Sequence, residues 1–520
     1  MSGYKKALIL AVLLFARPGL TLSAIEPPIL RVSMEDEPIT LNWNNVRTST
    51  DRFIISFLMR GLLKYDDEAR LVCDLCTSFT TSPDRRSLLF ELSDESWSDG
   101  AKLEAEQFVD SFRRLLDPAN RFRVHEDFRV IEGAVQSAKK WDPKKLGVRA
   151  ESKRKLEIQL SRPLSLFPHL LTTVAAFPIR KEFLHDTPPA GQKKSLPDTG
   201  EEHATEAVLG PYQLAAWERG KRIVIEGNQK FTGSRPVYRV EFILGKHAEQ
   251  IKRFKAGKLD IVSNPTTEDL LKVPGQKLQV NPYWATRNLI TNAGRQPGSD
   301  LSFRRALLYA LDRDTLPAYL RSGERRATGV IPPGLLGYRE LPLVTVDLAR
   351  AQAERSRAVP ARPVTLELLV LDTEVDRKVA QWISDQLQKI QVRIKVISKP
   401  SSGYYSELES GKFDLALVTW AFGIANPLDL LRTFHTDAAE NRVKWTHVGF
   451  DALLGQLLQE EKPAEAAALV DQTCQTLEVA GVGAIPLGYP TQPFLLGRRV
   501  NNFATTPFGD PDLVKIQLKQ

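Results

Sequence analysis

Cysteine is scarce in this chain, with three residues among 520. Cys73 and Cys76 form a C-x-x-C pair, but a redox site of the thioredoxin type needs such a pair at the start of a helix. The segment that follows is rich in Thr and Ser and closes on Pro83, so no helix is predicted there. Zinc would need four ligands, and no second pair exists. A local disulfide or two inert thiols is the expectation for the pair, and core packing accounts for Cys474.

Catalytic motifs are also missing. The seven histidines form no H-E-x-x-H and no pair at helical metal-ligand spacing. No G-x-S-x-G presents a serine nucleophile, and GQKKS at 191–195 lacks the leading glycine and spacing of a phosphate loop. Paired carboxylates of a glycoside hydrolase stay open, because spacing in sequence says little about spacing in space. We therefore expect a binding protein without catalytic residues, metal or cofactor, with a secreted hydrolase as the alternative.

No apolar run is long enough to cross a bilayer. Residues 1–24 instead have the pattern of a cleavable secretory signal, with a basic start at Lys5 and Lys6, an apolar run of about ten residues, and a cleavage site at Ala24. An uncleaved membrane anchor is the alternative. No cysteine near that site signals a lipid anchor. We expect the mature chain to be periplasmic or otherwise outside the cytoplasm.

Positive charge is in modest excess. The formal net charge is +8, and removal of Lys5, Lys6 and Arg17 with the signal leaves +8 − 3 = +5. The most basic stretch, residues 139–155, contains a single aromatic residue and is interrupted by acids. Nucleic-acid binding would favour interleaved aromatics, so this stretch is interpreted as a solvated face.

Strand and helix patterns alternate over a length that exceeds one hydrophobic core. Residues 155–160 and 392–398 alternate apolar and polar side chains, which predicts half-buried strands. Apolar residues at helical spacing predict helices from 105 to 116, ending before Pro118, and from 303 to 311. Residues 185–205 are polar, rich in Pro and Gly, and predict a flexible connection between lobes. The pattern indicates an α/β protein of two or three lobes, without internal repeats.

One stretch near the C-terminal end, FDLALVTWAFGIANP at 413–427, is almost devoid of polar residues. A strand that ends in a large ring is either core or a wall against which a ligand lies. Composition and periodicity alone favour the core.

Several segments resemble, in unbroken order, the family 5 extracellular solute-binding proteins of ABC importers, the oligopeptide- and dipeptide-binding group. The most specific is WSDGAKLEAEQFVDSFRRLLDP at 97–118, which is close to a family signature along its whole length. The other matching segments are ILRVSMEDEPITL at 29–41, RGLLKYD at 60–66, LGPYQLAAWERGKRIVIEGNQKF at 209–231, FKAGKLDIV at 254–262, NLITN at 288–292 before FRRA at 303–306, IPPG at 331–334 and AIPLGYP at 484–490.

The resemblance implies a two-lobed periplasmic-binding-protein clamshell with an additional inserted domain, three domains in all, and a hinge of two crossing strands. The first lobe would be discontinuous and comprise 25–66, 180–275 and 492–520. The inserted domain would be 67–179 and the second lobe 276–491. The implied partners are a peptide or other small-molecule ligand and the permease subunits of an ABC transporter. The implied assembly is a monomer.

The resemblance also implies a ligand site. Trp420 matches a tryptophan at the family's cleft, followed by main-chain groups that bond the ligand, and the first-lobe loop faces it. The implied ligand-binding residues are Trp420, Ala421, Phe422, Gly423, Thr48, Ser49 and Thr50.

Gly423 departs from the pattern, because peptide-binding members have an aspartate three residues after that Trp, which pairs with the ligand's α-ammonium. A buried ammonium without a carboxylate partner is costly. Either another acid supplies the charge, or the ligand has no free amino terminus. A non-peptide ligand (oligosaccharide, metal chelate or opine-like compound) and a sensor role remain open alternatives.

Overall fold

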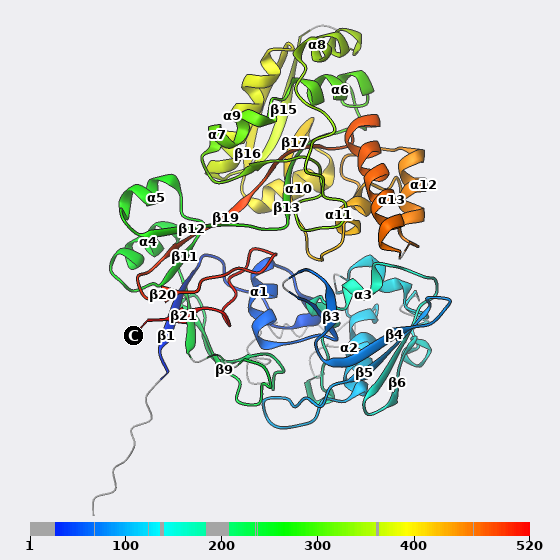
Figure 1. Cartoon of the computed structure of the whole chain (residues 1–520), viewed down its shortest axis with the longest axis vertical. Coiled ribbons are helices and arrows are strands. Elements are labelled where there is room, and N and C mark those ends of the chain that lie inside the picture. Colours follow the sequence, from blue (N-terminus) through cyan, green and yellow to red (C-terminus); the bar gives the residue numbers. More distant parts are fainter. Residues whose placement is uncertain are drawn as a thin grey trace, which may run out of the picture.

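The computed structural model describes residues 27–519 apart from 67, 123, 136–139, 184–206, 235, 237, 360–362 and 461. The predicted signal at 1–24 and the whole of the predicted connection at 185–205 lie outside the described residues. Two lobes, one above the other, and an inserted domain beside the lower lobe make up the molecule (Figure 1). None of the helices among the described residues combines the length and apolarity needed to cross a membrane.

The first lobe contains a seven-stranded sheet in the order β12-β19-β11-β1-β10-β9-β8. Strand β1 lies near its centre and runs parallel to β10 on one side and β11 on the other. The strands are β1 (Ile29–Met34), β8 (Tyr212–Glu218), β9 (Arg222–Gly227), β10 (Arg239–Leu244), β11 (Ile261–Ser263), β12 (Lys277–Pro282) and β19 (Thr491–Leu496). Helices α1 (Ser49–Leu58), α4 (His247–Lys255) and α5 (Thr267–Lys272) and the pair β20 (Val500–Asn501) and β21 (Gln517–Leu518) complete it.

The inserted domain contains a four-stranded antiparallel sheet in the order β4-β5-β7-β6, against which α2 packs. The apolar residues that the helical spacing places on one face of α2 are all buried, namely Ala105, Phe108, Val109, Phe112, Leu115 and Leu116. The helix ends at Asp117 because Pro118 follows. The elements are β2 (Leu63–Tyr65), β3 (Leu71–Cys73), β4 (Cys76–Thr81), β5 (Ser87–Leu92), α2 (Ala105–Leu116), η2 (Glu126–Val130), β6 (Val148–Ser152), β7 (Lys155–Gln159) and α3 (Phe167–Leu170).

The second lobe contains a six-stranded mixed sheet in the order β14-β18-β13-β17-β15-β16. Its strands are β13 (Ala285–Thr291), β14 (Arg325–Arg326), β15 (Val364–Leu371), β16 (Val392–Lys399), β17 (Leu415–Ala421) and β18 (Ile485–Tyr489). Its helices are α6 (Leu301–Ala310), α7 (Leu316–Leu320), α8 (Leu348–Arg357), α9 (Glu374–Gln388), α10 (Ser401–Ser410), α11 (Leu428–Leu431), η8 (Arg432–Phe434), α12 (Val448–Leu457), α13 (Pro463–Gln475) and the π-helical turn η9 (Thr476–Ala480).

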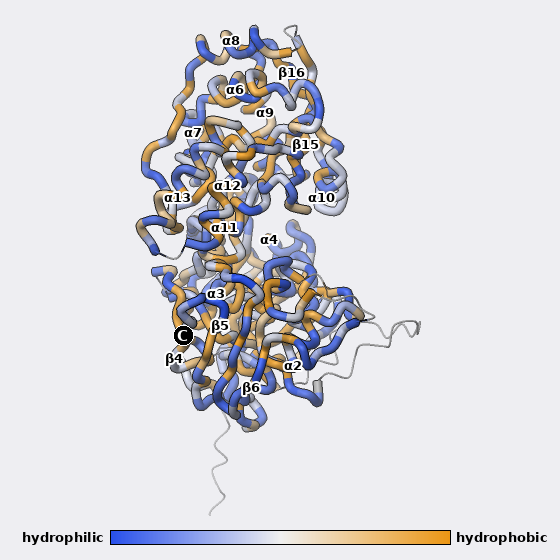
Figure 2. The backbone as a smooth tube through the Cα atoms, turned by 90° about the vertical axis from the view of Figure 1, so that its right-hand side faces the viewer, coloured by the Kyte–Doolittle hydropathy of each residue, from blue (hydrophilic) through white to orange (hydrophobic). Residues whose placement is uncertain are grey.

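The four elements predicted from periodicity are confirmed: strands β7 and β16, and helices α2 and α6. Apolar segments are concentrated inside both lobes, while hydrophilic segments lie along the outside (Figure 2). The basic stretch behaves as a solvated face over its described part: Lys153 is exposed and pairs with Glu104 at 2.8 Å.

The chain crosses between the lobes twice. Strand β12 of the first sheet continues into β13 of the second, and β18 returns into β19, so the two crossings run side by side and antiparallel. This arrangement is a hinge of two crossing strands. The expected start of the second lobe at residue 276 differs from the sheet, in which β12 still belongs to the first lobe. The reason is that β12 is the first half of a crossing strand. The remaining expected boundaries stay predictions.

Candidate functional site

A cavity of about 670 Å³ lies between the two lobes at the hinge. The first lobe contributes Glu35, His247 and Asn264, and the second contributes Arg287 and Thr419, together with other residues of both lobes. The volume falls within the range of small-molecule pockets, which is roughly 300–1,000 Å³. A cavity walled by both lobes of a hinged protein changes shape when the hinge moves.

A second cavity of about 270 Å³ adjoins the first and shares Glu35, Asn264 and Gln492 with it. Its remaining lining includes Ser49 and Thr50 at the start of α1. The two cavities therefore form one cleft, which runs from α1 across the first lobe to the second-lobe sheet.

The second-lobe wall of the cleft holds a buried charged triad. The Arg287 guanidinium lies 3.1 Å from the Glu324 carboxylate through Nε and also bonds Asp376 through Nη1. Burial by itself lowers the pKa of Arg287, but the two carboxylates outweigh it and raise this pKa. Three elements meet here: β13 carries Arg287, Asp376 lies in the first turn of α9, and Glu324 precedes β14. Each of the three charged side chains thus has a partner of opposite charge within this wall of the cleft.

The first-lobe wall has a matching polar cluster around His247, the first residue of α4. Its Nδ1 lies 2.7 Å from Oε1 of Glu35, and its Nε2 lies 2.5 Å from Oδ2 of Asp269. Burial lowers the pKa of His247, but the hydrogen bonds of Asp269 and Glu35 outweigh it, so the pKa is raised. The cluster ties the end of β1 to α4 and α5 at the mouth of the cavity.

The predicted first-lobe residues lie at the N-terminus of α1. Thr48 is the N-cap: its hydroxyl accepts from the Asp51 N–H at 3.1 Å, and the Asp51 carboxylate accepts the Thr48 N–H at 3.0 Å. This capping box stabilises the start of the helix. Ser49 and Thr50 line the smaller cavity, so the structure brings them to the cleft while the Thr48 side chain serves the cap.

Trp420 lies near the end of β17, where successive side chains point to opposite faces of the sheet. Thr419 lines the larger cavity, whereas the Trp420 ring packs at 5.2 Å from the ring of Phe434 and is half-buried. Among the described residues, the lining of both cavities does not include Trp420.

The main chain that follows Trp420 is already engaged. The Phe422 N–H donates to the Trp284 carbonyl at 2.8 Å, and the Gly423 N–H donates to Oδ2 of Asp429 at 2.7 Å. The Phe422 side chain is buried, whereas Ala421 and Gly423 are exposed. What this segment offers a ligand is therefore carbonyl oxygens and the nearby carboxylate rather than free N–H donors.

The carboxylate of Asp429 lies beside Gly423, the position at which the resemblance leads one to expect an aspartate. A Cβ added to Gly423 would lie 3.8 Å from Oδ2 of Asp429, so the carboxylate of residue 429 occupies space beside the bare position. Burial raises the pKa of Asp429, although the Gly423 N–H and the Arg432 guanidinium lower it. The Tyr65 ring belongs to the same region, because its hydroxyl bonds the main chain of Ala425.

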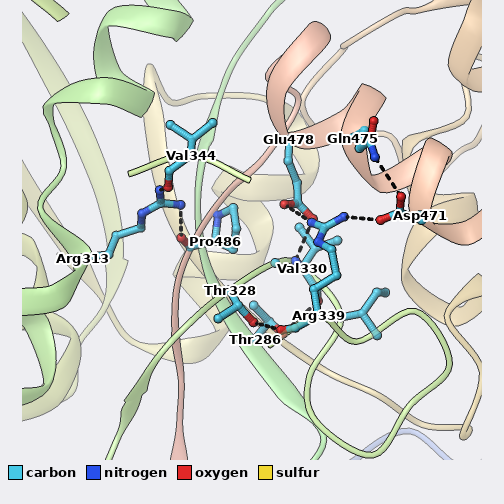
Figure 3. A network of polar contacts seen from close by, with 12 residues as sticks. Thr286, Arg313, Thr328, Val330, Arg339, Val344, Asp471, Gln475, Glu478 and Pro486 are labelled. Atoms are coloured by element: carbon cyan, nitrogen blue, oxygen red, sulfur yellow. Dashed lines mark hydrogen bonds and ion pairs between the residues drawn. The ribbon is translucent and has the colours of Figure 1, made fainter. Parts of the chain in front are cut away.

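Figure 3 shows a network of polar contacts that includes Thr286 of the second-lobe sheet. The Thr286 hydroxyl, on β13 opposite Trp420, donates to the Val330 carbonyl at 2.8 Å. The Val330 N–H donates to Glu478 at 3.0 Å, and Glu478 also bonds Arg339 at 2.7 Å. Burial raises the pKa of Glu478 to about 7 despite Arg339. The network joins β13 to the π-helical turn that carries Glu478.

Cys73 and Cys76 are joined by a disulfide between β3 and β4, with their Cα atoms 5.1 Å apart. Cys474 is a buried free thiol in α13. Over the described ranges, no group of three or more His, Cys, Asp or Glu side chains is placed to hold a metal ion.

Sequence reasoning did not single out Arg287, His247 or Asp429. Residues 285–291 read ATRNLIT, a mixture of polar and apolar residues, so no local pattern marks Arg287 as a buried charge. His247 and Asp429 gave no signal either, since each depends on how separate loops meet.

Two lobes joined by two crossing strands, with a polar cleft between them, define a clamshell binding protein. The chain matches the model of bacterial extracellular solute-binding proteins, family 5 (middle), over residues 70–442, and it belongs to that family.

Its relatives share about a quarter of their residues with it. The probable deoxycholate-binding periplasmic protein YgiS of Escherichia coli is 24% identical over 463 residues, which cover 85% of both chains. The periplasmic oligopeptide-binding protein OppA of Escherichia coli is 24% identical over 443 residues, covering 81% of this chain and 80% of that one. The solved structure of the Escherichia coli murein tripeptide binding protein MppA has the same fold, with a TM-score of 0.76, 23% identity, and coverage of 96% and 99%.

Proposed function

We propose that this chain is the periplasmic substrate-binding subunit of an ABC importer, which captures a peptide or a similar small solute in the cleft and delivers it to a membrane permease. The observation that carries the proposal is the cavity of about 670 Å³ walled by both lobes at the hinge. Ligand contacts that exist only when the lobes are closed would drive closure. The protein acts as a monomer and performs no chemistry on its ligand.

The charge of the cavity supports a neutral or zwitterionic ligand. Its lining holds four carboxylates, from Glu35, Glu324, Glu374 and Asp376, against three basic side chains, from Arg287, Arg321 and Lys378, together with His247. Most of these charges pair within their own lobe; Glu374, for example, lies 2.6 Å from Lys378. A strongly charged ligand would meet little uncompensated charge in this cavity. A peptide with both termini free carries one charge of each sign.

The proposed ligand contacts combine both lobes. Ser49 and Thr50 border the smaller cavity from the first lobe, with Thr48 fixing the helix start. From the second lobe the proposed contacts are Trp420 to Gly423, which follow the cavity-lining Thr419 along the chain and line neither cavity themselves. We assign the acid that Gly423 lacks to Asp429, whose carboxylate already lies against the Gly423 N–H. With that carboxylate in place, a free amino terminus finds a partner. Peptides held by main-chain hydrogen bonds can vary in their side chains.

A non-peptide solute is the second candidate. The glycine at position 423 favours it, and one relative is named for deoxycholate, a ligand without an amino group.

Mass spectrometry of small molecules released from protein purified from its native periplasm decides between these candidates. Recovery of peptides, followed by calorimetric titration with the same peptides, supports the first candidate. Recovery of a sugar, chelate or bile acid alone supports the second. Turnover of an offered peptide or glycoside by the purified protein would overturn both.

A further inference from the structure

The second lobe touches the inserted domain as well as the hinge. Arg432, in η8 just after α11, reaches η2 of the inserted domain, where its Nη1 lies 3.3 Å from Oδ2 of Asp127. Its Nη2 lies 2.6 Å from Nε2 of His125, the residue that directly precedes η2. Arg432 of the second lobe is 307 positions away in sequence from His125 of the inserted domain.

The contact is buried between the domains. The exposed fractions of the Arg432 and Asp127 side chains are 17% and 15%, and that of His125 is 25%. Burial raises the pKa of Asp127 although Arg432 lowers it, and burial lowers the pKa of His125 to about 3, with Arg432 adding to the effect. Arg432 must donate to the imidazole, so Nε2 carries no proton, and the proton of the neutral ring is on Nδ1, which lies 3.6 Å from Oδ2 of Asp127. Separating the domains would return all three groups to water.

Arg432 is attached to the ligand-facing segment. The Gly423 N–H bonds Asp429, and Asp429 lies three residues before Arg432 on the continuous turn of α11 and η8. Phe434, two residues after Arg432, packs on Trp420 at the end of β17. A shift of the end of β17, where the proposed ligand contacts lie, is therefore passed directly to Arg432.

We propose that His125 and Asp127 make the inserted domain a latch, which holds Arg432 when the second lobe closes and so stabilises the closed clamshell. Two neighbouring contacts mark the rest of this interface: the Ser165 N–H and the Arg85 guanidinium donate to the carbonyls of Leu458 and Gln459 at the end of α12, at 3.1 and 2.5 Å. Both contacts end on main-chain oxygens of the second lobe, so no side-chain substitution in that lobe removes them. The contact of Arg432 with His125 and Asp127 depends on side chains of both domains and can be removed from either side.

The test is a distance measurement by double electron–electron resonance in the full chain, with spin labels at exposed Lys155 in the inserted domain and exposed Lys412 in the second lobe. Arg432→Gln and Asp127→Asn are each expected to lower the closed population at least threefold. The reversed pair, Asp127→Arg with Arg432→Asp, is expected to restore at least half of it. Lys395→Ala, which breaks the exposed pair of Lys395 with Glu367 inside the second lobe, is the matched control and leaves the distances unchanged.

The latch is refuted if both single variants keep the distance distribution of the unmodified chain, or if the reversed pair is no better than the single variants. Circular dichroism and a cooperative melt establish that each variant is folded. Should Asp127→Asn fail to fold, His125→Gln keeps the test decisive, because it removes one of the two contacts to Arg432 without leaving a charge unpaired. The readout needs no ligand, so it stands apart from whether peptides are the solute.

Discussion

The main-chain N–H of Gly423 donates a hydrogen bond of 2.7 Å to the carboxylate of Asp429, six residues further along the chain. The acid expected at position 423 is absent from the sequence, yet a carboxylate lies beside that position in space. The loop after β17 folds back through Asn426 and Pro427 and brings residue 429 to it. We propose that this carboxylate supplies, from a different point of the same loop, the charge that position 423 lacks.

Removing the carboxylate at position 429 and restoring one at position 423 tests whether Asp429 replaces the missing acid. Asp429→Asn is expected to weaken the binding of a peptide with a free amino terminus by about 10- to 100-fold, the range of a hydrogen bond to a charged group. Binding of the same peptide acetylated at its amino terminus should change by less than about threefold. Gly423→Asp added to Asp429→Asn should restore the preference for the free amine. Isothermal titration calorimetry of the unmodified chain, the single variant and the double variant with each of the two peptides measures the six affinities.

Asp94→Asn, on the surface of the inserted domain, is the control and should leave both affinities unchanged. Equal losses for the free and the acetylated peptide would show that Asp429 only supports the loop. Failure of both peptides to bind the unmodified chain would count against a peptide ligand, and would say nothing of Asp429.

Closure should weaken in acid because of His125. With its contact to Arg432 in place its pKa is about 3, whereas an exposed imidazole has a pKa near 6.5. Between those values the open form binds the extra proton, so a falling pH favours opening. From pH 7.5 to 5.5 one such proton shifts the equilibrium by about 10-fold. Ligand affinity measured over this range should fall accordingly, and His125→Gln should flatten the profile.

Other charged groups around the contact between Arg432 and His125 act in a different pH range. Burial raises the pKa of Asp127, so its protonation favours the closed form, but only at the acid end of the profile. The groups that also act on Asp127 are Arg432, Arg162, Glu126 and Glu440. A pH dependence that persists unchanged in His125→Gln would assign the effect to these groups.

Arg339 should matter most for stability in alkaline solution. Its guanidinium is the cation that bonds Glu478, whose pKa burial raises to about 7 from an ordinary 4.5. The folded chain thus binds this proton more tightly than the unfolded chain. That contribution is present below about pH 4.5 and is lost as the pH rises through 7. Arg339→Met should therefore cost about 3–5 kcal/mol at pH 8 and clearly less at pH 5.5.

Urea unfolding of the full chain at both pH values measures this cost. Arg350→Met is a matched control, because Arg350 is exposed and its guanidinium lies over the Tyr309 ring at 4.1 Å. It should lower the free energy of unfolding by about 0.5–1 kcal/mol at either pH. A cost for Arg339→Met that does not depend on pH would contradict the role given to Glu478.

Two glycines should respond in opposite directions to alanine. A Cβ on Gly488, in β18 near the hinge, would lie 2.2 Å from Oε1 of Glu324 and disturb its pairing with Arg287. Gly488→Ala should therefore destabilise the chain by about 1–3 kcal/mol. Gly455, within α12, has nothing within 4 Å of the added atom, so Gly455→Ala should stabilise by about 0.5–1 kcal/mol. Thermal unfolding of both variants checks the pair, and a loss at Gly455 would contradict it.

The sequence predicts individual helices and strands of this molecule better than the contacts between them. Helix α2 follows from its apolar spacing and from Pro118, since both act within a few residues. The bond from His247 to Glu35 joins residues 212 positions apart, and no local pattern encodes it. The direction of the Trp420 ring was also out of reach, because either face of a strand buried on both sides can hold a large side chain.

Strand β19 occupies the second position of the first-lobe sheet, between β12 and β11, yet it is contributed by residues 491–496 near the end of the chain. A nascent chain therefore carries six of the seven strands long before it can close the gap, and it also lacks the returning half of the hinge. Loss of the last 30 residues to a stop codon or a protease would leave β12 and β11 facing each other across an empty strand position. The final segment thus acts as the last step of assembly and joins both lobes at once.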